Sequence, residues 1–353
     1  MKRFASLVSI LVISSSIVAV GSSPAGATFP GGNGDIAYLT RNGARAVQAD
    51  GSGDHQLATT GGDGLWDVRY SPDGSSIVFT DFTRKGARIL QQNLTTGDRT
   101  VILKRSDAPG SFIDSIAMSP DGASVVFCSS RRVSRLYTVQ TDGTGLVKVG
   151  SSVGYCFADW SVDDRIVASK GIFNEDGDRL VTTMDPDGSN QEVIAALPPA
   201  KQAWGILYYL VPTWAPDGSA VAFTAQRHRI HPDIWSVNAD GSGLHKLTDT
   251  KRVSEAGPVY SPDGTLVAFA RSDDRFRGDI WVMGADGSSP TQVTDTTRGE
   301  YPRSWQSTSG MSGAAGPTMG AARNASSAGS SSWSERAGWW RSARIPVIVV
   351  RSR

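Results

Sequence analysis

The sequence predicts an all-β fold, a six-bladed β-propeller of four-stranded antiparallel blades that is closed by a C-terminal strand joining three N-terminal strands. One observation behind this prediction is a repeated turn, in which an aromatic residue or methionine precedes a sequence close to Ser-Pro-Asp-Gly, at Tyr70, Met118, Trp160, Trp214 and Tyr260. A second is an x-Asp-Gly turn in segments such as "QADGSG" and "NADGSG". Both patterns recur about every 46 residues, which is the period of a four-stranded propeller blade.

Each repeat predicts four short strands in a fixed order. The first strand ends at the aromatic residue, because proline and Asp-Gly then make a tight turn. The second strand is a β-branched and aromatic run, at residues 77–79, 125–127, 166–168, 221–223 and 267–269. The third follows a loop of variable length, as in "DIWSVN", and the fourth follows the Asp-Gly turn, as in "LHKLTD". No run keeps a helical period, which supports the all-β prediction.

The two ends of the repeat region set the number of blades. Residues 34–59 match the second, third and fourth strands of a repeat, and residues 299–306, "GEYPRSWQ", match a first strand alone. Together they complete a sixth blade and leave no free sheet edge where the ends meet. An open β-solenoid would not explain these complementary fragments. A seventh blade would need another repeat after residue 306, where the sequence has none.

The N-terminal segment predicts export. Lys2 and Arg3 precede an apolar run dotted with serines, and Ala25-Gly26-Ala27 supplies the small residues that a signal peptidase requires. We therefore expect residues 1–27 to be a signal peptide and the mature chain to be secreted, or periplasmic and in the cell envelope, with no transmembrane anchor after cleavage. A retained membrane anchor is the alternative.

The mature chain divides into the propeller, residues 28–306, and a C-terminal tail, residues 307–353. The tail is dominated by Ser, Gly, Ala and Arg, so we expect it to be disordered. Two origins remain open for it: a cationic tail that binds the cell wall, or translation of a shifted reading frame.

The repeats resemble the TolB-like, WD40-like propeller repeat. Segments such as "YSPDGTLVAFA" followed by "DIWVMGADGSSPTQVTD" carry the resemblance, which covers residues 35–306 and implies the six-bladed propeller fold. TolB itself has an additional α/β domain before its propeller, whereas here the first blade directly follows the predicted signal peptide, so we expect a different member of the family. The third repeat departs from the pattern because Val162 and Asp163 replace Pro-Asp.

The charges predict one basic face. The formal net charge is only +1, which offers no general attraction to nucleic acid. Alternating strand direction places the short, acidic turns on one face and the variable loops on the other, where a basic rim is expected at Arg84, Arg131, Arg132, Arg227, Arg275 and Arg277. Such a rim predicts a protein or an anionic cell-envelope polymer as the partner of a monomeric chain. Alternatively, these arginines are solvated or paired with nearby acids such as Asp273, Asp274 and Glu175.

Inside that rim, the starts of the first strands are expected to line the mouth of the central channel. They predict a ligand site of acids and aromatic residues made by Trp66, Asp67, Asp114, Tyr155, Tyr209, Glu255, Glu300 and Tyr301. In the alternative interpretation, the aromatic side chains pack between blades and the acids cap strand ends.

Signals for catalysis are weak. His228 and His231 are candidate metal ligands on one loop, but no third ligand accompanies them, so no metal and no cofactor are predicted. Residues 150–154 match G-x-S-x-G, yet a strand follows them where a nucleophile elbow needs a helix. We therefore expect a non-catalytic binding or scaffold protein. The alternative is an enzyme or saccharide-binding protein with its site at the channel mouth.

Cys128 and Cys156 are the two cysteines of the chain. Counting along the hairpins places both at a similar height in neighbouring blades. In an oxidising compartment they can form a disulfide between blades, and two buried thiols remain the alternative.

Overall fold

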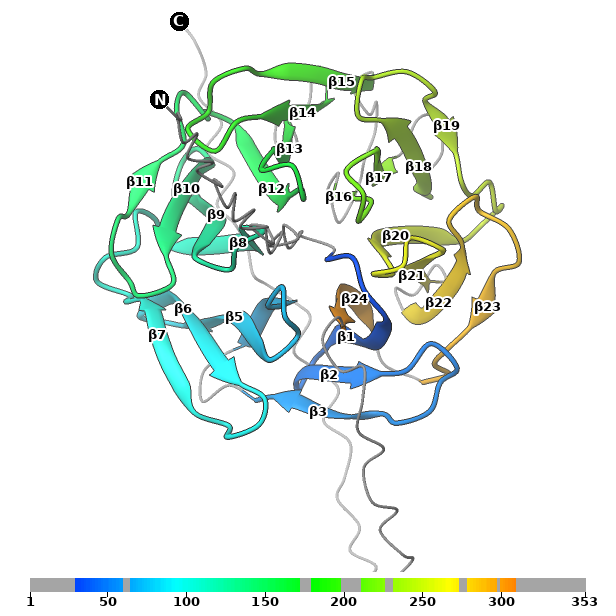
Figure 1. Cartoon of the computed structure of the whole chain (residues 1–353), viewed down its shortest axis with the longest axis horizontal. Coiled ribbons are helices and arrows are strands. Elements are labelled where there is room, and N and C mark those ends of the chain that lie inside the picture. Colours follow the sequence, from blue (N-terminus) through cyan, green and yellow to red (C-terminus); the bar gives the residue numbers. More distant parts are fainter. Residues whose placement is uncertain are drawn as a thin grey trace, which may run out of the picture. The chain divides into compact units, whose positions relative to one another are not determined.

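The computed structural model describes residues 29–59, 64–171, 179–197, 211–225, 231–272, 278–296 and 299–308. These residues form six antiparallel sheets of four strands, arranged as blades in a ring (Figure 1). The prediction of an all-β, six-bladed propeller is confirmed. The predicted signal peptide and C-terminal tail lie outside the described residues, apart from the first positions of the tail.

Four strands make each blade, and we number the blades in chain order. Blade 1 contains β24 (Tyr301–Ser307), β1 (Asn33–Thr40), β2 (Gly43–Val47) and β3 (His55–Ala58). Blade 2 contains β4 (Gly64–Tyr70), β5 (Ser76–Thr83), β6 (Gly86–Asn93) and β7 (Arg99–Leu103). Blade 3 contains β8 (Phe112–Met118), β9 (Ser124–Ser130), β10 (Arg135–Gln140) and β11 (Val147–Lys148).

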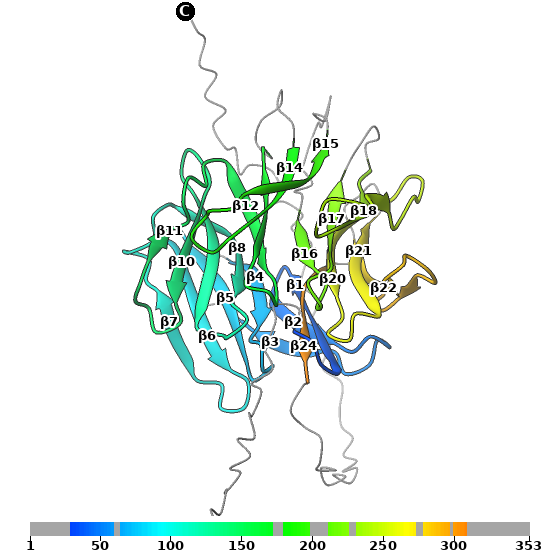
Figure 2. The same ribbon diagram turned by 45° about the horizontal axis from the view of Figure 1, so that its top comes forward.

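The remaining blades repeat this order. Blade 4 contains β12 (Tyr155–Trp160), β13 (Ile166–Lys170), β14 (Arg179–Met184) and β15 (Glu192–Leu197). Blade 5 contains β16 (Pro212–Trp214), β17 (Ala220–Ala225), β18 (Asp233–Asn238) and β19 (His245–Lys246). Blade 6 contains β20 (Ser254–Tyr260), β21 (Leu266–Ser272), β22 (Gly278–Gly284) and β23 (Thr291–Gln292). The first strand of each blade lies innermost in the ring (Figure 1, Figure 2).

The hydrophobic core lies between neighbouring blades. The second strand of most blades carries one fully buried phenylalanine, at Phe79, Phe127, Phe223 and Phe269. Apolar clusters combine residues of adjacent blades; Ile36 and Trp305 of blade 1, for example, pack with Val259 of blade 6. Apolar runs in the sequence therefore become strands whose two faces are both covered, which stabilises the ring through burial of apolar surface.

Strands from the two ends of the repeat region complete blade 1. Strand β24 pairs antiparallel with β1, with Trp305 opposite Ile36 and Ser304 opposite Ala37. The Trp305 indole also donates a hydrogen bond to the carbonyl of Gly34 at 2.9 Å. The predicted closing strand is therefore present, and β1 has no free edge.

The repeated turn uses its serine, aspartate and glycine together. In blade 2, the Gly74 amide donates to the Ser71 carbonyl at 2.9 Å, and the Ser71 hydroxyl donates to Asp73 at 2.6 Å. Gly74 has a φ of +67°, and a Cβ there would overlap the Ser307 carbonyl, so only glycine fits. In the departing third repeat, Asp164 takes a φ of +57° and accepts a hydrogen bond from the Trp160 indole, and the turn still forms.

Side chains of one blade accept hydrogen bonds from inner-strand amides of the next blade. This occurs at five junctions in the described part of the chain: Tyr70 N to Ser304 Oγ (3.0 Å), Ile116 N to Asp67 Oδ2 (3.0 Å), Ala158 N to Ser115 Oγ (3.4 Å), Trp214 N to Asp159 Oδ2 (2.8 Å) and Gly257 N to Thr224 Oγ1 (2.9 Å). We call them the junction hydrogen bonds. Each satisfies a backbone donor that has no strand on that side.

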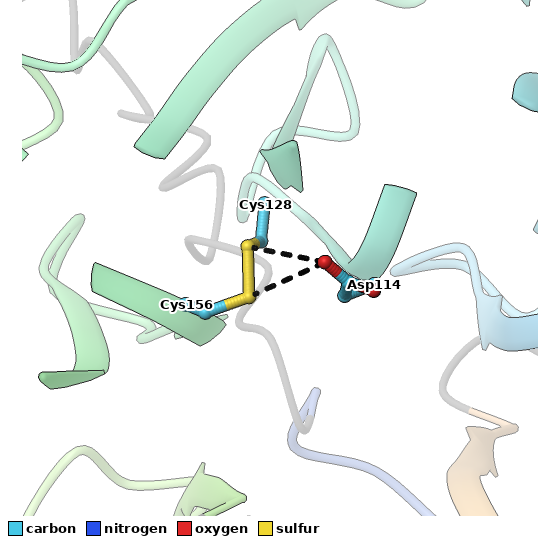
Figure 3. Close-up of side chains that lie close together, drawn as sticks. All are labelled: Asp114, Cys128 and Cys156. Atoms are coloured by element: carbon cyan, nitrogen blue, oxygen red, sulfur yellow. Dashed lines mark hydrogen bonds between the residues drawn. A yellow bond between two sulfur atoms is a disulfide. The ribbon is translucent and has the colours of Figure 1, made fainter. Parts of the chain in front are cut away.

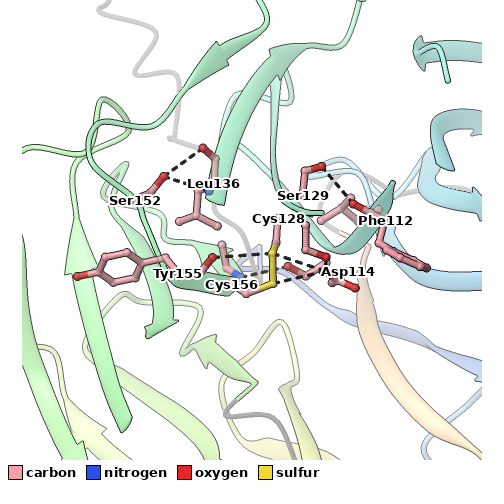
Figure 4. Close-up of a disulfide and its surroundings, with 12 residues drawn as sticks. Phe112, Asp114, Cys128, Ser129, Leu136, Ser152, Tyr155 and Cys156 are labelled. Carbon is pink, nitrogen blue, oxygen red and sulfur yellow. Dashed lines mark hydrogen bonds between the residues drawn. A yellow bond between two sulfur atoms is a disulfide. The ribbon is translucent and has the colours of Figure 1, made fainter. Parts of the chain in front are cut away.

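A disulfide joins β9 of blade 3 to β12 of blade 4 (Figure 4). It links Cys128 and Cys156, whose Cα atoms are 5.1 Å apart, and both side chains are fully buried. The bond adds a covalent connection to a junction that Ser115 also bridges. Within the described residues, no helix is long and apolar enough to cross a membrane.

Removing the closing strand should destabilise the whole ring. We expect a chain that ends at residue 298 to lose more unfolding free energy than the about 3–5 kcal/mol that truncation of one buried tryptophan costs, because the β1 edge is also exposed. Thermal unfolding followed by circular dichroism measures the loss. A chain that ends at residue 308 keeps β24 and is the control; equal melting temperatures for both chains would contradict the closure.

Thr224 tests the junction hydrogen bonds. Thr224→Val keeps the shape but leaves the Gly257 amide without its acceptor, so we expect a loss of about 1–3 kcal/mol of unfolding free energy in urea titrations. Thr224→Ser retains the hydroxyl and should recover part of that loss. If the valine variant is as stable as the unmodified chain, the hydrogen bond does not contribute.

The disulfide should stabilise the fold. Closing a loop over a sequence separation of 28 residues is worth about 3–4 kcal/mol in the chain-entropy model. We expect the Cys128→Ser/Cys156→Ser double variant to melt several degrees lower than the unmodified chain, and reductant to lower the melting temperature of the unmodified chain only. A reductant effect of the same size in the double variant would refute this assignment.

Candidate functional site

The two faces of the ring differ in what connects the strands. On the face that we call the turn face, the short turns after the first and third strands of each blade lie together, since neighbouring strands are antiparallel. On the opposite face, the loop face, the inner strands begin and the second strands end. The predicted channel-mouth residues belong to the loop-face ends of the inner strands or to the segments just before them.

β-bulges shape the inner strands near this face. In β4, Leu65 pairs with Asp81 and Val68 pairs with Phe79, so Trp66 and Asp67 together face Thr80. The Thr80 hydroxyl oxygen accepts hydrogen bonds from the main-chain amides of Trp66 and Asp67, at N–O distances of 3.2 and 3.0 Å. In β8, Asp114 is the extra residue of a similar bulge. Bulges re-aim side chains, and here they turn Trp66 outward and Asp67 into the junction with blade 3.

Three of the predicted acids are hydrogen-bonded to neighbouring protein groups. Asp67 accepts the Val68 and Ile116 amides. Glu255 is fully buried, and one of its oxygens binds the Arg271 guanidinium at 2.7 Å. Glu300 accepts the hydroxyls of two threonines, Thr294 and Thr296. Burial raises the pKa of Glu300, and the two hydroxyls oppose that rise. Of the three, only Asp67 accepts strand amides; Glu255 and Glu300 bind side chains, and Glu255 Oε2 is buried without a hydrogen-bond partner in the described part of the chain.

The fourth acid, Asp114, lies beside the disulfide (Figure 3). Its Oδ2 accepts the Ser130 hydroxyl at 2.7 Å and lies 3.9 and 4.0 Å from the sulfur atoms of Cys128 and Cys156. Burial raises the pKa of Asp114, against the Ser130 hydrogen bond. Among the described residues, this is the one group of three whose ligand atoms are close enough to share a metal ion. Its sulfurs are bonded to each other, so it offers no thiolate ligand.

The predicted aromatic residues differ in exposure. Trp66 is 48% exposed, whereas Tyr155 is buried and its hydroxyl donates to Gln191 at 3.1 Å. Tyr301 is partly buried at the start of β24. Tyr209 lies outside the described residues. Of these four, only Trp66 offers a largely exposed ring to a partner in the described structure.

Trp66 belongs to a stack of three aromatic rings, which we call the aromatic shelf. The Trp66 and Phe82 ring centroids are 6.0 Å apart in an edge-on arrangement, and Phe82 stacks on Phe112 at 5.3 Å. Phe112 is 42% exposed. The rings come from the loop-face ends of β4, β5 and β8, so the shelf spans blades 2 and 3. Exposed aromatic clusters are typical of binding surfaces.

Sequence reasoning missed two members of the shelf. Phe82 lies near the end of the second strand of its repeat, and Phe112 begins the first strand of the next. The signal was present, since both are large aromatic residues at loop-face strand ends, as Trp66 is. Their stacking depends on how two blades are placed, which one repeat does not reveal.

Basic side chains lie near the shelf on the same blades. Arg84, Arg131 and Arg132 of the predicted basic rim are exposed in the second-to-third strand loops of blades 2 and 3. Asp81, next to Phe82, is buried and binds Arg88 at 2.7 Å and Arg105 at 2.9 Å. One carboxylate thus faces two guanidinium groups, which leaves positive charge beside the shelf.

The other predicted basic and metal-binding residues give less information. Arg227, Arg275, Arg277 and His228 lie outside the described residues. His231 Nδ1 is 3.2 Å from the Ser254 hydroxyl.

Comparisons with known proteins agree with the fold. No family model and no curated protein matches the chain. TolB from Acinetobacter baumannii superposes with a TM-score of 0.61 and 21% identity, over 78% of this chain and 67% of its own. A putative TolB from Agrobacterium tumefaciens gives a TM-score of 0.57 and 17% identity, over 77% of this chain and 97% of its own.

A chain from the crystal structure of a nidogen/laminin complex is also similar, with a TM-score of 0.61 and 13% identity over 78% of this chain and 98% of its own. At these identities the similarity is one of fold. The predicted resemblance to the TolB-like repeat is therefore confirmed at that level, and the chain has the six-bladed β-propeller architecture found in TolB and similar proteins.

Proposed function

We propose that this chain is a secreted, non-catalytic binding protein that docks a partner protein through its loop face. The observation that carries the proposal is the aromatic shelf of Trp66, Phe82 and Phe112, with Trp66 and Phe112 exposed. Aromatic residues are enriched in protein interfaces, and tryptophan in particular is common among residues that dominate binding energy.

The charges near the shelf indicate the chemistry of the partner. Arg84, Arg131 and Arg132 are exposed on the blades that carry the shelf. Positive side chains at the rim of an interface steer an acidic partner and raise its association rate. We therefore expect the partner to present an acidic surface around an apolar centre.

Two further points support a binding role. A chain of the nidogen/laminin complex, a complex of two proteins, has a similar fold. In addition, Asp67, Glu255 and Glu300 hydrogen-bond to protein groups, which favours structural roles for them over acid-base chemistry. The proposal that the chain is exported rests on the signal-peptide pattern at residues 1–27.

Site-specific photo-crosslinking tests the proposal. Phe112→p-benzoylphenylalanine in the exported chain should yield a covalent adduct in the producing culture, and Trp66→Ala should reduce its yield several-fold because a central aromatic contact is lost. The matched controls are Val193→p-benzoylphenylalanine, at a residue 55% exposed on β15, and Val147→Ala, at a residue 59% exposed on β11.

Digestion of the adduct identifies the partner class. An adduct that proteases degrade supports a protein partner, whereas one that only glycan-degrading enzymes shorten would replace it with a cell-envelope polymer or saccharide. Equal adducts from positions 112 and 193, or no adduct from position 112, would reject the shelf as the binding surface.

A further inference from the structure

Two arginines lie together on the inner strands of blades 1 and 2. Arg69 belongs to β4 and Arg303 to β24, and an Nη1 hydrogen of Arg69 donates to the main-chain carbonyl of Arg303. The side chains are 12% and 25% exposed, so they are enclosed by the ring but reachable by solvent. Neither residue is a member of the aromatic shelf.

Within the described ranges, the two guanidinium groups make few hydrogen bonds to the protein. Each carries five N–H donors. In the described part of the chain, Nε of Arg69 and Nε of Arg303 are both buried without a hydrogen-bond partner. Two buried donors of this kind, on charged groups, are costly unless water or a ligand satisfies them. Burial lowers the pKa of Arg303; the charge of Asp67 opposes that fall and the charge of Arg69 adds to it.

In the described structure, the one nearby carboxylate, that of Asp67, does not accept hydrogen bonds from these donors. Asp67 lies 3.5 Å from Arg69 Nη2 and 3.8 Å from Arg303 Nε, which are distances of ion pairs and not of hydrogen bonds. Its two oxygens already accept the Val68 and Ile116 amides at 2.9 and 3.0 Å. It is the one carboxylate in ion-pair contact with either arginine among the residues described.

A second carboxylate interacts with Arg69 only through space. Asp159 of blade 4 is buried and accepts the Trp214 amide and the Thr213 hydroxyl at 2.8 and 3.2 Å. Burial raises the pKa of Asp159, and the charge of Arg69 opposes that rise. The arginine pair therefore has unfilled hydrogen-bonding capacity, and among the described residues only Asp67 is in ion-pair contact with its two positive charges.

We propose that Arg69 and Arg303 form a binding site for one oxyanion, the carboxylate or phosphate group of a small ligand. Guanidinium groups present planar pairs of donors that match the oxygens of both groups, and the enclosed setting strengthens each charge-assisted hydrogen bond. A bound anion would accept hydrogen bonds from the two Nε donors. It would also add a second negative charge beside the two guanidinium groups, where, of the described residues, Asp67 alone is in ion-pair contact with both. This site goes beyond the proposed partner surface, because it involves none of the shelf residues.

Calorimetric titration of the purified full chain with sodium phosphate, sulfate or acetate, at ionic strength held constant with sodium chloride, tests the site. We expect saturable binding of at least one anion. Arg303→Gln should weaken it about tenfold or more, because one charge-assisted contact is removed. Binding of acetate but not phosphate assigns a carboxylate ligand, and the reverse assigns a phosphate ligand.

Arg45→Gln is the matched control. The Arg45 side chain is 28% exposed, similar to that of Arg303, but it pairs with Asp54 at 2.8 Å and should not affect anion binding. Absence of saturable binding for all three anions, or an equal loss in the Arg45 variant, would overturn the proposal.

Chemical modification of the unmodified chain gives a second test, which does not depend on whether the Arg303 variant folds. Phenylglyoxal reacts with accessible arginines, and mass spectrometry locates the adducts. Phosphate, or whichever anion binds, should slow modification of Arg303 several-fold and leave Arg45 unchanged. Equal rates at Arg303 with and without the anion would also overturn the proposal.

Discussion

The free edge of each inner strand is the constraint on which this ring depends. Each inner strand pairs with one neighbour in its blade, and its other edge has no strand beside it. Unpaired amides in a buried setting must find acceptors. At five junctions of the described structure, an acceptor from the preceding blade binds such an amide. At all five junctions the acceptor belongs to the preceding blade and the amide to the following one. These contacts therefore fix the relative placement of the blades that they join.

This constraint also determines which polar groups remain for function. Asp67 and Asp159 lie on inner strands that line the centre of the ring, yet each accepts a hydrogen bond from a main-chain amide of the next blade. Trp66, Phe112, Arg84, Arg131 and Arg132, by contrast, remain exposed on the loop face. The bulge that aims Asp67 into the junction is the same bulge that turns Trp66 outward. A structural requirement and a candidate binding surface thus arise from one local irregularity.

The fold could be predicted from sequence because its signals are local and repeated. The Ser-Pro-Asp-Gly turn needs nothing beyond its own residues, and the half repeats at 34–59 and 299–306 reveal the closure. The junction acceptors could not be predicted, because Ser115, Asp159 and Thr224 differ in residue type and in their place along the repeat. No motif therefore marks them.

The candidate site was predicted in part for a related reason. Position along the repeat places both Trp66 and Tyr155 near the loop-face start of an inner strand, but it does not reveal that Trp66 is 48% exposed and Tyr155 buried. The difference lies in packing against the neighbouring blade. Phe112 was overlooked because its exposure depends on contacts across blades 2 and 3, and not on its own repeat.

The pairing of β24 with β1 has a consequence for biosynthesis. Strand β1 ends at Thr40, and its partner begins only at Tyr301, so the first strand to emerge waits for nearly the last segment of the propeller to be synthesised. During that interval its edge is open to pairing with other chains. Such a long-range contact also slows folding, because distant segments must meet before they stabilise each other. A chaperone that binds nascent β-strands would therefore protect the edge of β1 in the interval before β24 is synthesised.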